Sequence, residues 1–287
     1  MPLMIRLNNV SYTYMSGGPF EKTAVSDVNI TIPTGEFIGL MGHTGSGKST
    51  IIQMIAGLLK PTSGSVEVDG VELYSKDCNM RKMRFKTGLV MQYPEYQLFE
   101  ETVFKDIAFG PLNMGLSEDE VNKRVLEAAH LVGISEDTLS KSPFELSGGQ
   151  KRRVAIAGIL AMKPEILILD EPTAGLDPAG RDEILFKIRE MHQKWGITVI
   201  LVSHRMEDLA NLADKIMVMN KGSLAMFDQT EKIFKRADEL KKIGLSVPQI
   251  TEICHELRQK GFPIDDGIYT IDAAKAEIEK ILKQEKS

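Results

Sequence analysis

The run Gly42–Ser49, with the sequence GHTGSGKS, constrains this chain more than any other feature. Two glycines separated by four residues and followed by Lys and Ser have the spacing of a phosphate-binding loop. The glycines let the backbone curl until its N–H groups point into one hollow, and such a hollow binds an anion. The segments on either side support this interpretation. Phe37–Met41 is typical of a buried strand, and residues 51–58 have apolar side chains at helical spacing.

This loop predicts a site for a nucleoside triphosphate and its metal ion. We expect Lys48 to reach the β- and γ-phosphates and Ser49 to bind Mg²⁺. The predicted nucleotide-contacting residues of the loop are Gly42, His43, Thr44, Gly45, Ser46, Gly47, Lys48, Ser49 and Thr50.

Length and charge narrow the class of protein. With 287 residues, the chain has room for one large domain or for one domain plus an appendage. A net charge of −5 gives no basic footprint for nucleic acid, and two cysteines suit a reducing compartment rather than a disulfide framework. The first residues lack the pattern of a signal peptide, and no apolar run is long enough to span a membrane. Contact with a membrane would then depend on a partner protein.

Apolar runs and turn residues divide the chain into strands and helices. The runs 166–169 and 198–202 are apolar without alternation, which is typical of strands buried on both faces of a parallel sheet. Helices are expected over 101–142, with a break at Gly115 and a capping box formed by Ser117 and Glu120. The other expected elements are strands at 3–11, 25–33, 66–70 and 87–91 and a hairpin at 215–227 that turns at 220–222.

After about residue 235 the sequence pattern changes to that of short amphipathic helices. Ser246 and Gln249 predict a capping box with Pro248 in the first helical turn, and Gly261 ends that helix. We therefore expect a helical C-terminal domain at 236–287 after a first domain at 1–235. Its two apolar strips are Ile250, Ile253, Cys254 and Leu257, and then Ile271, Ala274, Ile278 and Ile281.

Two carboxylates and a histidine follow the buried strands. The apolar run 166–169 ends in Asp170 and Glu171, and His204 comes two residues after the run 198–202. Ligands of parallel sheets bind at the carboxyl ends of the strands, where these side chains meet. We expect Asp170 to bind Mg²⁺, Glu171 to polarise the attacking water, and His204 to contact the γ-phosphate or orient the water.

A further motif makes the chain resemble the ATP-binding cassette (ABC) ATPases. The signature segment Leu146–Gln150 (LSGGQ) precedes a predicted helix, where a Ser and paired glycines make an anion site. Its place between the phosphate loop and Asp170 resembles the signature of this family. Gln92 matches the family's Q-loop and residues 174–177 its D-loop. The resemblance implies roles in catalysis and Mg²⁺ binding for Gln92, and contact with ATP for Gln92, Ser147, Gly148, Gly149, Gln150 and Asp177.

The resemblance covers residues 1–235 and also implies how ATP is held. Tyr14 resembles the aromatic residue that stacks on adenine, with Tyr12 as the competing choice, since aromatic residues on edge strands commonly serve packing. The family forms head-to-tail dimers, in which ATP lies between Lys48 of one subunit and Ser147–Gly149 of the other.

A narrower likeness is to the ATPases of energy-coupling factor (ECF) transporters, in particular the second, A′-type, subunit of the pair. It rests on SYTY at 11–14, PFEK at 19–22, GHTG at 42–45, QYPEYQLF at 92–99 and VAIAG at 154–158. Lys151 departs from the Met or Gln expected in relatives, without touching a catalytic role. Residues 94–99 resemble the segment that receives the coupling helices of the transmembrane T component; the alternative is a plain surface loop.

Together these features predict an α/β fold with a RecA-like P-loop core, an antiparallel β subdomain, a helical signature subdomain and a helical C-terminal extension. The expected function is ATP hydrolysis at the cytoplasmic face of the cell membrane. It would power uptake of a vitamin or transition-metal ion through a T component and substrate-binding S components, beside a second ATPase. Alternatives are a homodimer, the ATPase of another importer, a soluble ABC protein acting on DNA or ribosomes, and a regulatory module without turnover.

Overall fold

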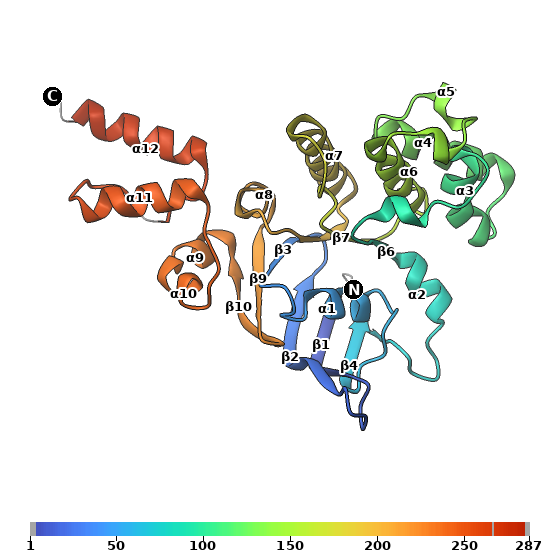
Figure 1. The fold of residues 1–287 in the computed structure, drawn as a ribbon, viewed down its shortest axis with the longest axis horizontal. Helices are drawn as coiled ribbons and strands as arrows, with labels where there is room; N and C mark the ends of the chain where they lie inside the picture. Colours follow the sequence, from blue (N-terminus) through green and yellow to red (C-terminus); the bar gives the residue numbers. More distant parts are fainter. Residues whose placement is uncertain (1–3, 266, 285–287) are drawn as a thin grey trace.

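Two sheets organise the chain in a computed structural model that describes residues 4–265 and 267–284. The first sheet is antiparallel, with strand order β2-β1-β4-β5, and it forms the lower part of Figure 1. The predicted strand 3–11 begins at Leu3, outside the described residues, and its described part runs on to Tyr14. The strands are β1 (Met4–Tyr14), β2 (Lys22–Pro33), β4 (Ser63–Val68) and β5 (Val71–Glu72).

The second sheet has the order β10-β9-β3-β8-β7-β6 and is parallel except for the hairpin of its last two strands. That hairpin confirms the prediction for 215–227. Because the other strands run the same way, the residues after β3, β7 and β8 meet at one edge. The strands are β3 (Phe37–Met41), β6 (Thr87–Val90), β7 (Ile166–Asp170), β8 (Thr198–Val202), β9 (Lys215–Asn220) and β10 (Ser223–Gln229).

Both faces of the parallel sheet are buried, as the unbroken apolar runs predict. Ile166 and Ile168 of β7 face a core that helix α1 (Lys48–Ile55) and the antiparallel sheet complete. Leu167 and Leu169 face the opposite core, which most of the remaining helices cover. Helix α1 therefore lies between the two sheets, and this packing fixes the end of the loop that precedes it.

The second face carries most of the helices between residues 80 and 234, whereas α2 packs Met83 into the first core. Helices α3 to α6 form a helical subdomain at one end of the molecule, α7 and α8 lie nearer the centre, and α9 lies on the other side beside β10 (Figure 1). The bounds are α2 (Met80–Lys86), η1 (Pro94–Gln97), α3 (Val103–Asn113), α4 (Glu118–Leu131), α5 (Glu136–Leu139), η2 (Pro143–Glu145), α6 (Gly148–Leu160), α7 (Pro178–Trp195), α8 (Met206–Leu212) and α9 (Thr230–Phe234).

The helical break at Gly115 is confirmed, and Ser117 caps α4 by accepting a hydrogen bond from the N–H of Glu120. The other half of the predicted capping box is wrong. The Glu120 carboxylate turns to Arg124, whose Nε lies 2.7 Å away, one helical turn along the chain. A charged partner at i+4 competes for the carboxylate with the backbone N–H of the cap.

The C-terminal extension comprises α10 (Ala237–Lys242), α11 (Gln249–Gln259) and α12 (Ile271–Gln284). Leu240, Leu245 and Val247 lie in the large core, whereas a separate small cluster surrounds Cys254 between α11 and α12. That pair of helices projects at the end opposite the helical subdomain (Figure 1). The division at residue 235 stays a prediction; residues 237–247 pack with the first part of the chain.

The predicted capping box of Ser246 and Gln249 is wrong. Helix α11 begins at Gln249, and its N-cap is Pro248, which has no side-chain oxygen to accept a bond. Instead the N–H of Gln249 donates to Glu207 Oε1 of α8, 3.4 Å away. Burial of Leu245 and Val247 sets the path of the chain here, so that a tertiary contact replaces the local cap. No helix among residues 4–265 and 267–284 is both long and apolar enough to cross a membrane.

Candidate active site

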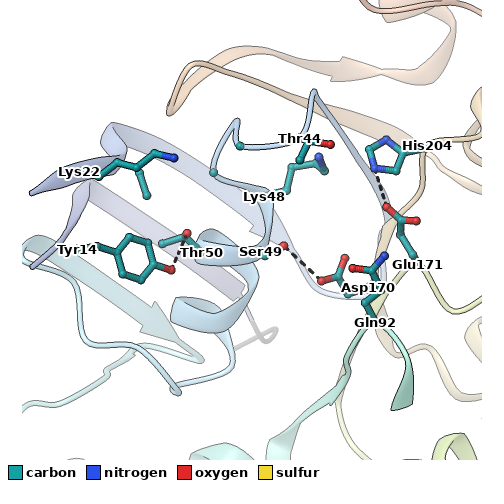
Figure 2. A pocket seen from close by; sticks show the side chains of 13 residues that line it. Tyr14, Lys22, Thr44, Lys48, Ser49, Thr50, Gln92, Asp170, Glu171 and His204 are labelled. Atoms are coloured by element: carbon teal, nitrogen blue, oxygen red, sulfur yellow. Dashed lines mark hydrogen bonds and ion pairs between the residues drawn. The ribbon is translucent and has the colours of Figure 1, made fainter. Parts of the chain in front are cut away.

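A cavity of about 350 Å³ lies at the carboxyl edge of the parallel sheet, over the phosphate loop. Figure 2 shows Tyr14 and Lys22 on one side, Asp170, Glu171, Gln92 and His204 on the other, and Lys48 and Ser49 between them. The lining residues are Tyr14, Lys22, Ala24, Thr44, Gly45, Gly47, Lys48, Ser49, Thr50, Gln92, Asp170, Glu171 and His204.

The phosphate loop needs glycine at two positions for lack of space. A Cβ on Gly42 would lie 2.3 Å from the carbonyl oxygen of Met219, and one on Gly47 would lie 2.5 Å from that of Ala24. Both residues also have positive φ, 151° and 100°. The loop is therefore pressed between the two sheets in a conformation that side chains would block.

Lys48 is held by the loop that it follows. Its Nζ donates hydrogen bonds to the carbonyl oxygens of Gly42, 2.7 Å away, and His43, 3.0 Å away. Burial lowers the pKa of Lys48, and the carboxylates of Glu171 and Asp170 oppose that shift. A phosphate entering the cavity would bring further negative charge to this ammonium group, which favours its charged form.

Asp170 and Ser49 form a pair of oxygens suited to a hard cation. The Ser49 hydroxyl donates to Asp170 Oδ2 over 3.4 Å. Neighbouring ligands of an octahedral Mg²⁺, each about 2.1 Å from the metal, lie about 3 Å apart, close to this spacing. Burial raises the pKa of Asp170, and the charge of Glu171 raises it further. A cation here would relieve that cost, so the donor set fits Mg²⁺.

Glu171 and His204 meet across neighbouring strands. Glu171 follows β7 and His204 follows β8, and the imidazole Nε2 lies 2.7 Å from Glu171 Oε1. The backbone of Glu171 has φ of 50°, which is uncommon for a residue other than glycine, and its N–H donates to the carbonyl of Val202. A strained backbone at a cavity edge is typical of functional sites, where surrounding structure maintains the strain.

An aromatic side chain lines the side of the cavity away from the carboxylates. Tyr14 lines it, and its hydroxyl forms a 3.2 Å hydrogen bond with Thr50 Oγ1. Tyr12, the competing choice, packs against the apolar core and meets Tyr14 edge to face. Lys22 and Ala24 also line the cavity, and the sequence reasoning missed them. Pairing of β1 with β2 places Lys22 directly opposite Tyr14. The signal that could have found it was the pair of expected strands at 3–11 and 25–33, extended toward the loop between them.

The signature segment lies elsewhere in the chain. Ser147 caps α6 in a full capping box, with its N–H donating to Gln150 Oε1. Asp177 caps α7, and Leu176 beside it lies 3.6 Å from where a Cβ on Gly149 would be. Of the predicted residues, those outside the cavity lining are Gly42, His43, Ser46, Ser147, Gly148, Gly149, Gln150 and Asp177.

The fold and site define a P-loop nucleotide-binding protein, because the loop joins β3 to α1 beside the two carboxylates at the end of β7 and the histidine that follows β8. A sequence profile described as "ABC transporter" matches residues 25–174. The energy-coupling factor transporter ATP-binding protein EcfA2 of Caldanaerobacter subterraneus subsp. tengcongensis is 56% identical over 283 residues, 99% of each chain. The protein of the same name from Clostridium acetobutylicum is 57% identical over 98% of this chain and 99% of its own.

Comparison with solved structures also finds ABC-type ATP-binding proteins. CbiO1 from Clostridium perfringens, described as part of the ABC transporter complex CbiONQ, aligns with a TM-score of 0.74 and 37% identity over 90% of this chain and 100% of its own. A dimeric ATP-binding cassette in a post-hydrolysis state with ADP and Pi aligns with a TM-score of 0.71 and 32% identity, over 79% and 98%.

This chain belongs to the ABC transporter family, and within it to the ATP-binding proteins of energy-coupling factor transporters. It is an ATPase whose hydrolysis of ATP is coupled to transport. The predicted α/β cassette is confirmed.

Proposed function

We propose that this subunit powers uptake of a vitamin or a transition-metal ion from the cytoplasmic face of the cell membrane. It would act with a second ATPase, a membrane T component and substrate-binding S components. The observation that carries the proposal is an exposed apolar surface that follows Gln92 of the ATP site directly in the chain.

That surface supports a docking role for the segment after the Q-loop. Tyr96 is 85% exposed and Phe99 is 60% exposed, and Phe99 meets the half-exposed Phe109 of α3 edge to face. Beside them is a groove of about 330 Å³, lined mainly by apolar residues of α3 and α6. Large exposed aromatic side chains gathered at a groove are typical of a partner site. Gln92 lies on the cavity wall, so movement of this segment would reach the ATP site.

The geometry supports a separate role for each of the polar side chains in the cavity. Lys48 would bind the β- and γ-phosphates, and Glu171 would accept a proton from the attacking water while its bond to His204 keeps the carboxylate oriented. Ser49, Asp170 and Gln92 would hold Mg²⁺, which neutralises phosphate charge when bound. Tyr14 would stack on the adenine.

A second cassette would complete the site. Ser147 and Asp177 lie outside the cavity of their own chain, although the family motif assigns them to ATP. A head-to-tail pair of cassettes brings them to the facing nucleotide, in agreement with the dimeric state named for a similar solved cassette. We favour a heterodimer because of the A′-type sequence features. A homodimer is the alternative, since both halves of the site are present in this chain.

Co-expression tests the proposal. This chain would be produced with its T and S components, with and without a second ATPase, and substrate uptake into cells would be measured. We expect uptake only when both ATPases are present. Full uptake without the second ATPase would establish the homodimer, and failure to co-purify with the T component would contradict the transport role.

A further inference from the structure

The side chain of His43 connects the phosphate loop to the C-terminal extension. Its Nε2 lies 2.7 Å from the carbonyl oxygen of Ile243, 200 positions further along the chain. Since a carbonyl oxygen only accepts, the Nε2 carries the hydrogen of this bond. The imidazole is not part of the cavity lining, so this contact is separate from any contact of the loop backbone with phosphate.

The carbonyl oxygen of Ile243 can accept this hydrogen bond because of the way in which α10 ends. Ile243 is the C-cap of α10, and Gly244 turns the chain with φ of 76°. The N–H groups of Gly244 and Leu245 donate to the carbonyls of Lys241 and Leu240, as in a Schellman motif. The carbonyl at the C-cap then has no partner within the helix, and His43 supplies one.

Gly244 also makes room for the imidazole. A Cβ at this position would lie 2.9 Å from His43 Nε2, too close for a real contact. Leu240 and Leu245, on either side of the turn, are buried in the large core, so the turn is a firm anchor. The main chain of His43 is tied at the same time, because its carbonyl accepts from Lys48 Nζ and from the N–H of Ser46.

We propose that His43 is a positioning residue that joins the phosphate loop to the turn at Ile243–Leu245. The bond holds the loop in its phosphate-binding form before ATP arrives, which lowers the ordering cost of binding. Coupling of this kind is reciprocal, so bound ATP steadies the turn and hence the start of the C-terminal extension.

The full-length chain tests the proposal through ATP affinity. A neutral hydrogen bond of this kind corresponds to roughly a two- to tenfold change in a dissociation constant. We expect His43→Ala to weaken ATP binding by that factor with little change in kcat at saturating ATP. His43→Gln should restore affinity, because its amide nitrogen can donate to the same carbonyl. Equal ATP affinity of His43→Ala and the unaltered chain would overturn the proposal.

Hydrogen exchange of the backbone amides tests the reciprocal effect. Saturating ATP should slow exchange at Gly244 and Leu245 in the unaltered chain, and His43→Ala should abolish that slowing although its site is filled. A merely structural role of His43 would leave the slowing in place. Identical ATP-dependent protection in both proteins would refute the coupling.

A pair of glycine variants gives a test that leaves His43 in place. Gly244→Ala strains a left-handed residue and presses on the imidazole, and we expect weaker ATP binding. Gly261→Ala is the matched control, because Gly261 closes α11 with φ of 94° and has open space around its Cβ position. Both variants incur similar backbone strain. Equal ATP affinity in these two variants would count against the role of His43.

Discussion

Glu171 Oε1 lies 2.7 Å from His204 Nε2 at the carboxyl ends of the neighbouring strands β7 and β8. The side chains belong to residues 33 positions apart, and only the parallel pairing of the two strands brings them together. One oxygen of the carboxylate is thereby directed at the imidazole while the residue still lines the cavity above Lys48. The bond orients the group that we assign to the attacking water.

The first prediction concerns that carboxylate. Glu171→Gln should bind ATP with nearly unchanged affinity and lose hydrolysis by roughly 10²–10⁴-fold, because an amide cannot accept the proton of water. Phosphate release by the assembled transporter measures turnover, and equilibrium dialysis measures binding. Glu165→Gln, an exposed position just before the same strand, is the control with expected normal rates. Near-normal hydrolysis by Glu171→Gln would refute the assignment.

The second prediction concerns the buried charge of Asp170. Its pKa is raised by burial and by Glu171, so the ionised carboxylate destabilises the nucleotide-free fold above its native pKa. Asp170→Asn should therefore raise the melting temperature at neutral and higher pH. This gain in melting temperature should shrink as the pH falls through the pKa that Asp170 has in the folded protein. It should vanish below the pKa that Asp170 has in the unfolded chain. Each 1 kcal/mol of relief corresponds to about 2–4 °C in a domain of 150–250 residues.

Thermal denaturation without nucleotide, over a range of pH, measures this effect. Asp77→Asn is the control, since that residue is exposed on the loop before α2. The Asp170→Asn variant should also lose the extra stabilisation that Mg²⁺ gives to ATP-bound protein. A melting temperature that falls at neutral pH would contradict the electrostatic argument.

The third prediction separates the two parts of the C-terminal extension. Removal of residues 249–287 takes away α11, α12, their small cluster and Tyr269 at the edge of the large core, and it should leave the cassette folded with only a modestly lower melting temperature. Removal of residues 237–287 also takes Leu240, Leu245 and Val247 from the large core. Loss of a buried leucine side chain costs about 2–5 kcal/mol, so this variant should be strongly destabilised.

Both truncations lack the helix pair, so their difference isolates the segment 237–248. The shorter truncation should associate more weakly with other ATPase subunits, because Ile253 and Ile271 of the removed pair are exposed apolar residues at 49% and 73%. Sedimentation velocity measures association. Equal melting temperatures of the two truncations would contradict the core assignment, and unaltered association would exclude an assembly role for the pair.

The fourth prediction concerns the docking surface. Tyr96→Ala should reduce co-purification of the T component at least fivefold while ATP binding by the isolated subunit stays unchanged, because Tyr96 is 85% exposed and packs little within its own chain. Phe186→Ala, which removes an aromatic residue 64% exposed on α7, is the matched control. Equal recovery of the T component with both variants would show that the surface after Gln92 is not the docking site.

Motif spacing predicted much of the site because the phosphate loop is local. The hollow around Lys48 is formed by consecutive residues, and the strand before it and the helix after it have periodicities that can be read directly. The positions of Asp170 and His204 followed from one general rule, that parallel strands end at the same edge. Lys22 escaped prediction because it reaches the cavity only through the register of β2 against β1.

The failures also have a common physical cause. Both predicted capping boxes competed with charged side chains that the local pattern did not weigh, Arg124 one turn away and Glu207 on another helix. At Ser147 and Gln150, which also follow a Ser-x-x-Gln pattern, the full capping box does form. The same spacing therefore gives a full capping box at Ser147 but not at Ser117 or Ser246, depending on the side chains that surround each site.

The sequence by itself determined the class of fold, the phosphate loop and the buried strands, because these depend on backbone geometry and on apolar periodicity along a short stretch of chain. Tertiary structure alone decided the bond of Glu171 to His204, the left-handed backbone of Glu171, the choice of Tyr14 over Tyr12 at the cavity, and the contact of His43 with Ile243. Each of these joins residues that are distant in the chain or depends on how strands register and cores close, and packing settles such details only when the whole molecule is folded.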